Sequence, residues 1–234
     1  ITSRPLGPVL ITGLGLMGGS LAAALTHVGM KVLLHHHRPE VARSAAALGW
    51  GTAIDSFDQA TKAHLAVVCT PVGIIARTVR AIAAVTSAVI TDVGSTKGEL
   101  AIELNDLTAR YIGSHPMCGS HLQGLANADR DLYRGRLTLV TPVMHTNVDH
   151  LAAIEQLWVS VGSRVQRLSP TDHDRVVAEV SHLPHILASV TASMLPSSSL
   201  TPLGSSECRS MNPLTAANNP SFSPDSCVPP ATVG

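Results

Sequence analysis

The chain has 234 residues, with 16 lysines and arginines against 16 aspartates and glutamates, and only 3% of its residues are aromatic. This length accommodates one full domain and part of a second, and the balanced charge excludes the basic surface by which proteins bind nucleic acid. No apolar run approaches the roughly 18 residues of a membrane span, and the four cysteines lack CxxC and zinc-ligand spacing, so we expect a cytoplasmic protein with no nucleic-acid, membrane or metal partner.

Strand-like apolar runs alternate with helix-length segments along most of the chain. The strands are expected at residues 9–12, 31–35, 63–70, 88–93, 110–113, 136–141 and 164–168. The helices are expected at residues 18–28, 39–48, 74–84, 97–109, 147–161 and 171–195. Because buried parallel strands are almost continuously apolar, the pattern predicts an α/β fold of the Rossmann type, a doubly wound parallel sheet covered by helices.

The last expected helix begins a second, α-helical region. Its start at 169–172 has the capping pattern SPTD, and Pro184 is expected to kink it. After Leu195 the chain is rich in proline and serine and has almost no charge, a composition that does not fold alone. We therefore expect a dinucleotide-binding domain at 1–168, the first helix of a helical domain at 169–195, and a disordered or aberrant tail at 196–234.

The segment 13–18, GLGLMG, follows a strand and opens a helix, which is the context that a dinucleotide-binding glycine motif requires. The first glycine permits a tight turn, the second lets the backbone approach the pyrophosphate, and the third allows close helix packing. Amides at the start of the helix then bind the phosphates. The residues expected to contact the cofactor, in this loop and at the end of the strand at 63–70, are Gly13, Gly15, Leu16, Met17, Gly18, Thr70 and Pro71.

The second strand lacks the terminal acid that usually binds the ribose hydroxyls in such sites. It ends in His35-His36-His37-Arg38, with His36 at the position of the acid. A carboxylate there would favour NAD, whereas Arg38 and His36 suit the 2′-phosphate of NADP, so the sequence favours NADP. The alternative is a solvated basic strand end, with NAD held by backbone contacts.

Two further segments carry side chains suited to chemistry. The segment 92–97, DVGSTK, ends a strand and begins a helix, where Ser95 and Thr96 either cap the helix or face the ligand crevice. The segment 113–120, GSHPMCGS, places His115 in a turn after the next strand, where α/β enzymes carry catalytic groups. We therefore expect Ser95 beside His115, orienting the imidazole or sharing the hydrogen bond to a substrate hydroxyl.

The segment 181–185, SHLPH, adds two histidines to the last expected helix. His182 and His185 are three residues apart and, with Glu179, suggest a metal site, but Pro184 interrupts the helix that would hold it. Polarity of the helix surface is a second interpretation. We favour contact of this segment with the substrate.

In order and spacing, GLGLMGGS at 13–20, DVGSTK at 92–97, GSHPMCGS at 113–120 and SHLPH at 181–185 resemble the prephenate/arogenate dehydrogenase family of tyrosine biosynthesis. The resemblance covers about residues 9–195. It implies oxidative decarboxylation of prephenate to 4-hydroxyphenylpyruvate, or of arogenate to tyrosine, with hydride transfer to NAD or NADP. It also implies that His115 takes the proton of the ring hydroxyl and that Ser95 assists. The residues implied to line the substrate side are Ser181, His185 and His173.

The chain also departs from the family. His121 and Leu122 stand where the family often has an acidic and a basic residue. The family is homodimeric, and its helical dimerisation domain supplies an arginine for a substrate carboxylate. This chain becomes rich in proline and serine first, so we expect that region to be missing.

Two alternatives to an active prephenate or arogenate dehydrogenase stay open. One is a non-catalytic dinucleotide-binding remnant without a complete substrate site, which the composition of the tail favours. The other is a dehydrogenase of the hydroxyacid type, which depends on a lysine of the interdomain helix, whereas the helix expected at 171–195 contains no lysine.

Overall fold

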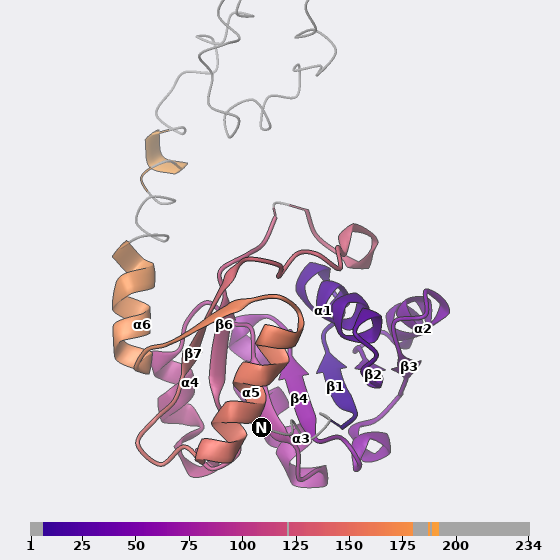
Figure 1. Cartoon of the computed structure of the whole chain (residues 1–234), viewed down its shortest axis with the longest axis horizontal. Coiled ribbons are helices and arrows are strands. Elements are labelled where there is room, and N and C mark those ends of the chain that lie inside the picture. Colours follow the sequence, from indigo (N-terminus) through magenta and orange to yellow (C-terminus); the bar gives the residue numbers. More distant parts are fainter. Residues whose placement is uncertain (1–6, 121, 180–186, 188, 192–234) are drawn as a thin grey trace, which may run out of the picture. The chain divides into compact units, whose positions relative to one another are not determined.

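The structure, a computed structural model, describes residues 7–120, 122–179, 187 and 189–191 (Figure 1). The chain divides into two compact units, residues 1–180 and 181–234. Almost all of the second unit lies outside the described residues, and the helices and strands labelled in Figure 1 belong to the first. Within the described part of the chain, no helix is long and apolar enough to cross a membrane.

Five parallel strands form the main sheet (Figure 1). In spatial order they are β3 (Thr52–Ala53), β2 (Val32–His35), β1 (Val9–Thr12), β4 (Leu65–Val68) and β5 (Val89–Asp92). The helices that connect them are α1 (Leu16–His27), α2 (Pro39–Ala47) and α3 (Ile75–Val85). The expected α/β sheet of the Rossmann type is confirmed. Its strand order reverses between β1 and β4, the place where sheets of this kind bind ligands at their carboxyl ends.

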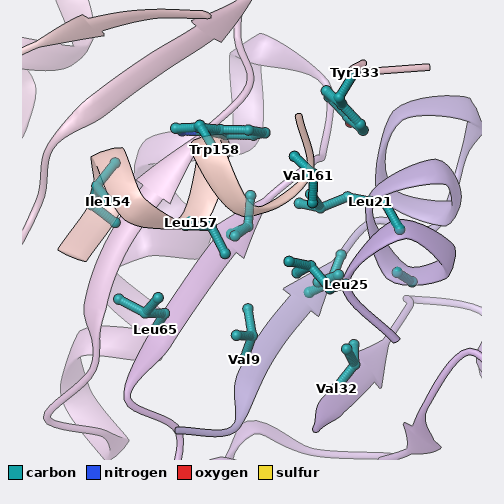
Figure 2. Close-up of a cluster of buried hydrophobic side chains, with 14 of the residues drawn as sticks. Val9, Leu21, Leu25, Val32, Leu65, Tyr133, Ile154, Leu157, Trp158 and Val161 are labelled. Carbon is teal, nitrogen blue, oxygen red and sulfur yellow. The ribbon is translucent and has the colours of Figure 1, made fainter. Parts of the chain in front are cut away.

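Alternate side chains of the central strands enter two different hydrophobic clusters. Val9 and Ile11 of β1 belong to the first cluster and Leu10 to the second. The first cluster includes side chains of α1 and of α5 (Val148–Ser160), and Figure 2 shows them packed over the strands. The second includes side chains of α3. Burial of each large aliphatic side chain contributes about 1.5–3 kcal/mol, so both faces of the sheet are stabilised, which explains why its central strands are mostly apolar.

A second sheet contains β6 (Gly113–Pro116), β7 (Leu137–Thr141) and β8 (Arg164–Arg167). A parallel bridge between Ile90 of β5 and Tyr111 links the main sheet to the segment that leads into β6. The pair β6–β7 is antiparallel, an exception to the parallel pattern read from the sequence. His115 lies within β6, opposite Leu139 of β7, so its expected place in a turn after a strand at 110–113 is wrong.

The composition of β6 explains that error. Glycine, serine and proline are typical of turns, but a proline is also tolerated on an edge strand, which needs no backbone donor on its outer side. β6 is an edge strand of the three-stranded sheet, and Pro116 pairs there with Thr138. The strand therefore forms from residues that, read locally, favour a turn.

The helix α4 (Gly98–Glu103) is shorter than expected, whereas α6 (Pro170–Val177) begins where the sequence predicts. α4 ends well before the expected residue 109 and is followed by a 3-10 turn, Asn105–Leu107. At the start of α6, Ser169 Oγ accepts from the Asp172 amide at 3.0 Å. The expected kink at Pro184 and the tail at 196–234 lie outside the described residues. The domain boundaries at 168 and 195 stay predictions.

Candidate active site

The glycine loop between β1 and α1 is shaped by two close approaches. Gly13 has φ +90°, and a Cβ added there would lie 2.6 Å from the carbonyl oxygen of Cys69. A Cβ on Gly18 would lie 2.0 Å from the carbonyl oxygen of Gly13. A Cβ on Gly15 would meet no heavy atom within 4 Å. The first and third glycines are therefore required by packing, and the second leaves open space at the start of the helix.

The space beside Gly15 fits the phosphates of a dinucleotide. Gly15 precedes the first residue of α1, Leu16, and neither a side-chain cap nor an acidic residue neutralises this end of the helix. Anions bind favourably at such uncapped amides. Met17, in the first turn, accepts a hydrogen bond on its carbonyl from the Tyr133 hydroxyl at 2.7 Å, which anchors the turn.

A buried hydroxyl at the carboxyl ends of the strands of the main sheet also fits a ligand. Among the side chains that the structure describes, Thr70 Oγ1 is the one buried polar atom without a hydrogen-bond partner. A buried hydroxyl left unpaired costs free energy. Thr70 follows β4, the neighbour of β1, and Pro71 precedes the 3-10 turn Val72–Ile74. The expected cofactor residues of both strands therefore lie at the point where the strand order reverses.

The end of β2 separates its histidines into two roles. His35 Nδ1 lies 2.8 Å from Thr12 Oγ1, and its ring contacts Phe57 at a centroid distance of 4.3 Å, so it is part of the packing. His36 Nδ1 accepts from the Arg38 amide at 3.0 Å. Burial, followed by the neighbouring His37 and Arg38, lowers the pKa of His36. Arg38 is exposed and precedes α2.

His115 is held in place through its neighbour Ser114. The buried Ser114 Oγ lies 2.7 Å from Thr91 Oγ1 and accepts from Trp158 Nε1 at 3.0 Å. Successive side chains of a strand point to opposite faces, so this anchoring of Ser114 turns His115 to the other face of β6.

One hydrogen bond links His115 to His173 of α6, and a second continues from His173 to Asp174. His115 Nδ1 lies 2.9 Å from His173 Nε2, and His173 Nδ1 lies 2.8 Å from Asp174 Oδ1. His173 is completely buried, and both of its ring nitrogens have these partners. It therefore stands behind His115, which differs from its expected place on the substrate side. Burial lowers the pKa of His173, although Asp174 opposes the shift.

Asp174 also caps α4, a role that the sequence left open for Ser95 and Thr96. Its Oδ1 accepts from the Lys97 amide at 2.8 Å and its Oδ2 from the Gly98 amide at 2.7 Å. The helix has no side-chain cap from its own preceding residues, so the capping alternative for Ser95 and Thr96 is wrong. Burial opposes ionisation of Asp174, but the hydrogen bonds from Gly98, His173 and Lys97 lower the pKa of this carboxyl.

Asp92 belongs to the candidate site through its contacts, although the sequence did not single it out. It is fully buried at the end of β5 and forms an ion pair with the ammonium of Lys97, which is 1% exposed. Its carboxylate also accepts from Gly94 N at 2.8 Å, Ser114 N at 3.3 Å and Tyr111 Oη at 3.0 Å. One carboxylate thus holds the residues that directly precede Ser95 and His115. The signal in the sequence was an aspartate and a lysine flanking the same loop.

The structure does not cover the whole expected site. Ser181 and His185, and the alternative metal ligand His182, lie outside the described residues. Within the described ranges, no group of three or more metal-ligating side chains comes together. The role of Ser95 beside His115 stays a prediction.

Two family models match the chain. The nucleotide-binding domain of prephenate dehydrogenase matches residues 21–167, more than half of the chain, and the dimerization domain of prephenate dehydrogenase matches residues 169–221. The second match continues past Leu195, so the expectation that the dimerisation region is missing is not confirmed.

Individual relatives agree with the family models. Prephenate dehydrogenase of Bacillus subtilis (strain 168) is 33% identical over 77% of this chain and 51% of that enzyme. The structure of prephenate dehydrogenase from A. aeolicus, in complex with hydroxyphenyl propionate and NAD+, superposes with TM-score 0.77 and 31% identity over 83% of this chain and 71% of that one. Arogenate dehydrogenase of Synechocystis follows with TM-score 0.75 and 28% identity, over 80% and 68% of the two chains.

The chain spans about half the length of the Bacillus subtilis enzyme. The first family match nevertheless begins within α1, directly after the glycine loop, and includes the Asp92–Lys97 loop and β6. The resemblance read from the four motifs is confirmed, and the chain belongs to the prephenate dehydrogenase family.

Proposed function

We propose that this protein oxidatively decarboxylates prephenate to 4-hydroxyphenylpyruvate, or arogenate to tyrosine, with transfer of a hydride to a nicotinamide dinucleotide. The observation that carries the proposal is the hydrogen bond between His115 and the buried imidazole of His173. It lies in a chain that matches the nucleotide-binding domain of the family and has free space beside Gly15. The names of the relatives support both substrates, since one is a prephenate and another an arogenate dehydrogenase.

His115 acts as the base in this proposal. It accepts the proton of the ring hydroxyl, while the hydrogen on the same carbon leaves with its electron pair. The bond to the ring carboxylate then breaks, carbon dioxide departs, the electron pair of that bond completes the aromatic ring, and His115 returns its proton to the ring oxygen. A bound nicotinamide dinucleotide supplies the hydride acceptor. Ser95 shares the hydrogen bond to the hydroxyl. A positioned base such as His115 contributes about 10²–10⁴-fold in rate.

The substrate side is proposed to include Ser181 and His185 from the segment that follows α6. His173, which the family resemblance placed there, contacts His115 from behind and is fully buried. We therefore assign it to the support of His115.

NADP is the proposed cofactor in preference to NAD. The exposed Arg38 and the half-buried His36 stand where an acid would bind the ribose hydroxyls, and Arg38 is suited to pair with a phosphate. The structure of the A. aeolicus relative contains NAD+, so the preference concerns this chain alone. Dissociation constants of the purified protein for NADP and NAD test it, and tighter binding of NAD would contradict it.

The activity itself is tested by mixing the purified chain with NADP or NAD and either prephenate or arogenate. We expect substrate-dependent formation of the reduced dinucleotide with release of an equal amount of carbon dioxide. Binding of the dinucleotide without reduction by either substrate would refute the proposal and favour the non-catalytic remnant.

A further inference from the structure

The hydrogen bonds behind His115 end at one carboxylate, Asp174. We infer that Asp174 is a positioning residue that acts through His173: it holds His115 in the tautomer whose Nε2 lone pair takes the proton of the substrate hydroxyl. The inference rests on the proposed role of His115 as the base. It adds two residues to that role, neither of which touches the reacting atoms.

The proton positions follow from the fixed end of the hydrogen-bond chain. The Asp174 carboxylate faces two backbone amides, with Oδ1 at 2.8 Å from Lys97 N and Oδ2 at 2.7 Å from Gly98 N. Backbone amides only donate. Both oxygens are therefore acceptors, which is the arrangement of an ionised carboxylate. His173 Nδ1, 2.8 Å from Oδ1, must then carry a proton and donate it.

The other ring nitrogen of His173, Nε2, faces His115. A neutral imidazole has one protonated nitrogen and one acceptor, and complete burial disfavours the charged form. With its proton on Nδ1, His173 offers a lone pair on Nε2 to His115 Nδ1 at 2.9 Å. His115 therefore donates from Nδ1, and its Nε2 carries the lone pair. The base is prepared before the substrate arrives.

The same chain stabilises the product of proton transfer. When His115 Nε2 accepts a proton, the ring becomes a cation, and the carboxylate at the far end of the chain favours that charge. The groups that face His173 from the packed elements are His115 on β6, Asp92 on β5, Lys97 before α4 and Asp174 on its own helix. Of these, Asp174 is hydrogen-bonded to His173 Nδ1, the ring nitrogen that does not face His115.

A purely structural role is the alternative, because Asp174 also caps α4. A cap affects stability, whereas the inferred role affects the protonation of His115. The two roles separate experimentally when the imidazole between them is removed. His173→Phe keeps a ring in the buried position but breaks the hydrogen-bond chain, and the amides of α4 still face Asp174.

The first test reads the tautomers directly. Nitrogen-15 NMR is recorded on the whole chain with labelled histidine and without substrate. At a pH where both rings are neutral, His115 and His173 should each carry their proton on Nδ1. A protonated Nε2 on His115 would overturn the inference. This measurement needs no turnover, so a failure of the proposed reaction would leave its result intact.

The second test is kinetic. Asp174→Asn should lower kcat about 10²-fold or more, leave the dissociation constant of the dinucleotide unchanged, and shift the acidic limb of the pH profile to lower pH. In the His173→Phe background the same substitution should change kcat less than twofold, while still lowering the unfolding midpoint. An equal loss of kcat in both backgrounds, or loss of stability alone, would show that Asp174 only caps the helix. If Asp174→Asn does not fold, the NMR result on the unmodified protein decides.

Discussion

The buried pair Asp92–Lys97 offers a quantitative test of how the site is held together. Asp92→Asn removes the negative charge and leaves the Lys97 ammonium, 1% exposed, without its ion pair. The amide also loses acceptor capacity for the donors at Gly94 N, Ser114 N and Tyr111 Oη. Breaking a buried pair from one side costs about 3–5 kcal/mol. At about 2–4 °C per kcal/mol for a chain of this size, the unfolding midpoint should fall by about 6–20 °C.

The assay is denaturant and thermal unfolding of four proteins: wild type, Asp92→Asn, Lys97→Met and the double variant. Because replacing both partners of a buried pair by neutral groups is often nearly neutral, the double variant should recover most of the loss seen in either single variant. The control is Asp106→Asn, in a pair with Arg80 whose side chains are 54% and 46% exposed. This substitution should hardly change the midpoint. A loss in Asp92→Asn no larger than in the control would refute the reasoning.

Three further predictions address the expected cofactor residues Arg38 and Gly15 and the thiol of Cys118. Arg38→Ala should weaken NADP binding at least tenfold and leave NAD binding unchanged in calorimetric titrations; equal affinities for NADP before and after would remove the 2′-phosphate contact. Gly15→Val should fold normally, because a Cβ there meets no heavy atom within 4 Å, yet lose affinity for both dinucleotides; normal affinity would place the phosphates elsewhere. Burial, opposed by Arg136, raises the pKa of Cys118 to about 11. Alkylation of this thiol should therefore be slow at pH 8 and become about tenfold faster with each pH unit between pH 8 and the pKa. Rapid alkylation of Cys118 at pH 8 would contradict this prediction.

The fold was predictable because its signals are local. The strands β1, β4 and β5 are buried at every position and therefore mostly apolar. The glycine loop was likewise predictable, since its three glycines form a local pattern between a strand and a helix. The cap of α6 by Ser169 followed from a pattern of four consecutive residues.

The features of the candidate site that could not be predicted depend on contacts between distant segments of the chain. Asp174 caps a helix 77 residues earlier in the chain, so no local pattern could identify it. The place of His115 in a strand depends on pairing with β7, which overrides the turn preference of glycine, serine and proline. Two of the four donors to the Asp92 carboxylate come from Tyr111 and Ser114, so no local pattern could show that this carboxylate joins two segments of the site.

The central claim is that His115 is the base of a dehydrogenase reaction. Its most direct test compares kcat and dinucleotide affinity for wild type, His115→Asn and the control His145→Asn, an exposed histidine on another loop. With prephenate or arogenate in excess, we expect kcat of His115→Asn to fall by about 10²–10⁴-fold, with unchanged dinucleotide affinity and a wild-type rate for the control. A His115→Asn variant that keeps the wild-type rate, or loses dinucleotide binding in the same proportion as activity, would contradict the assignment.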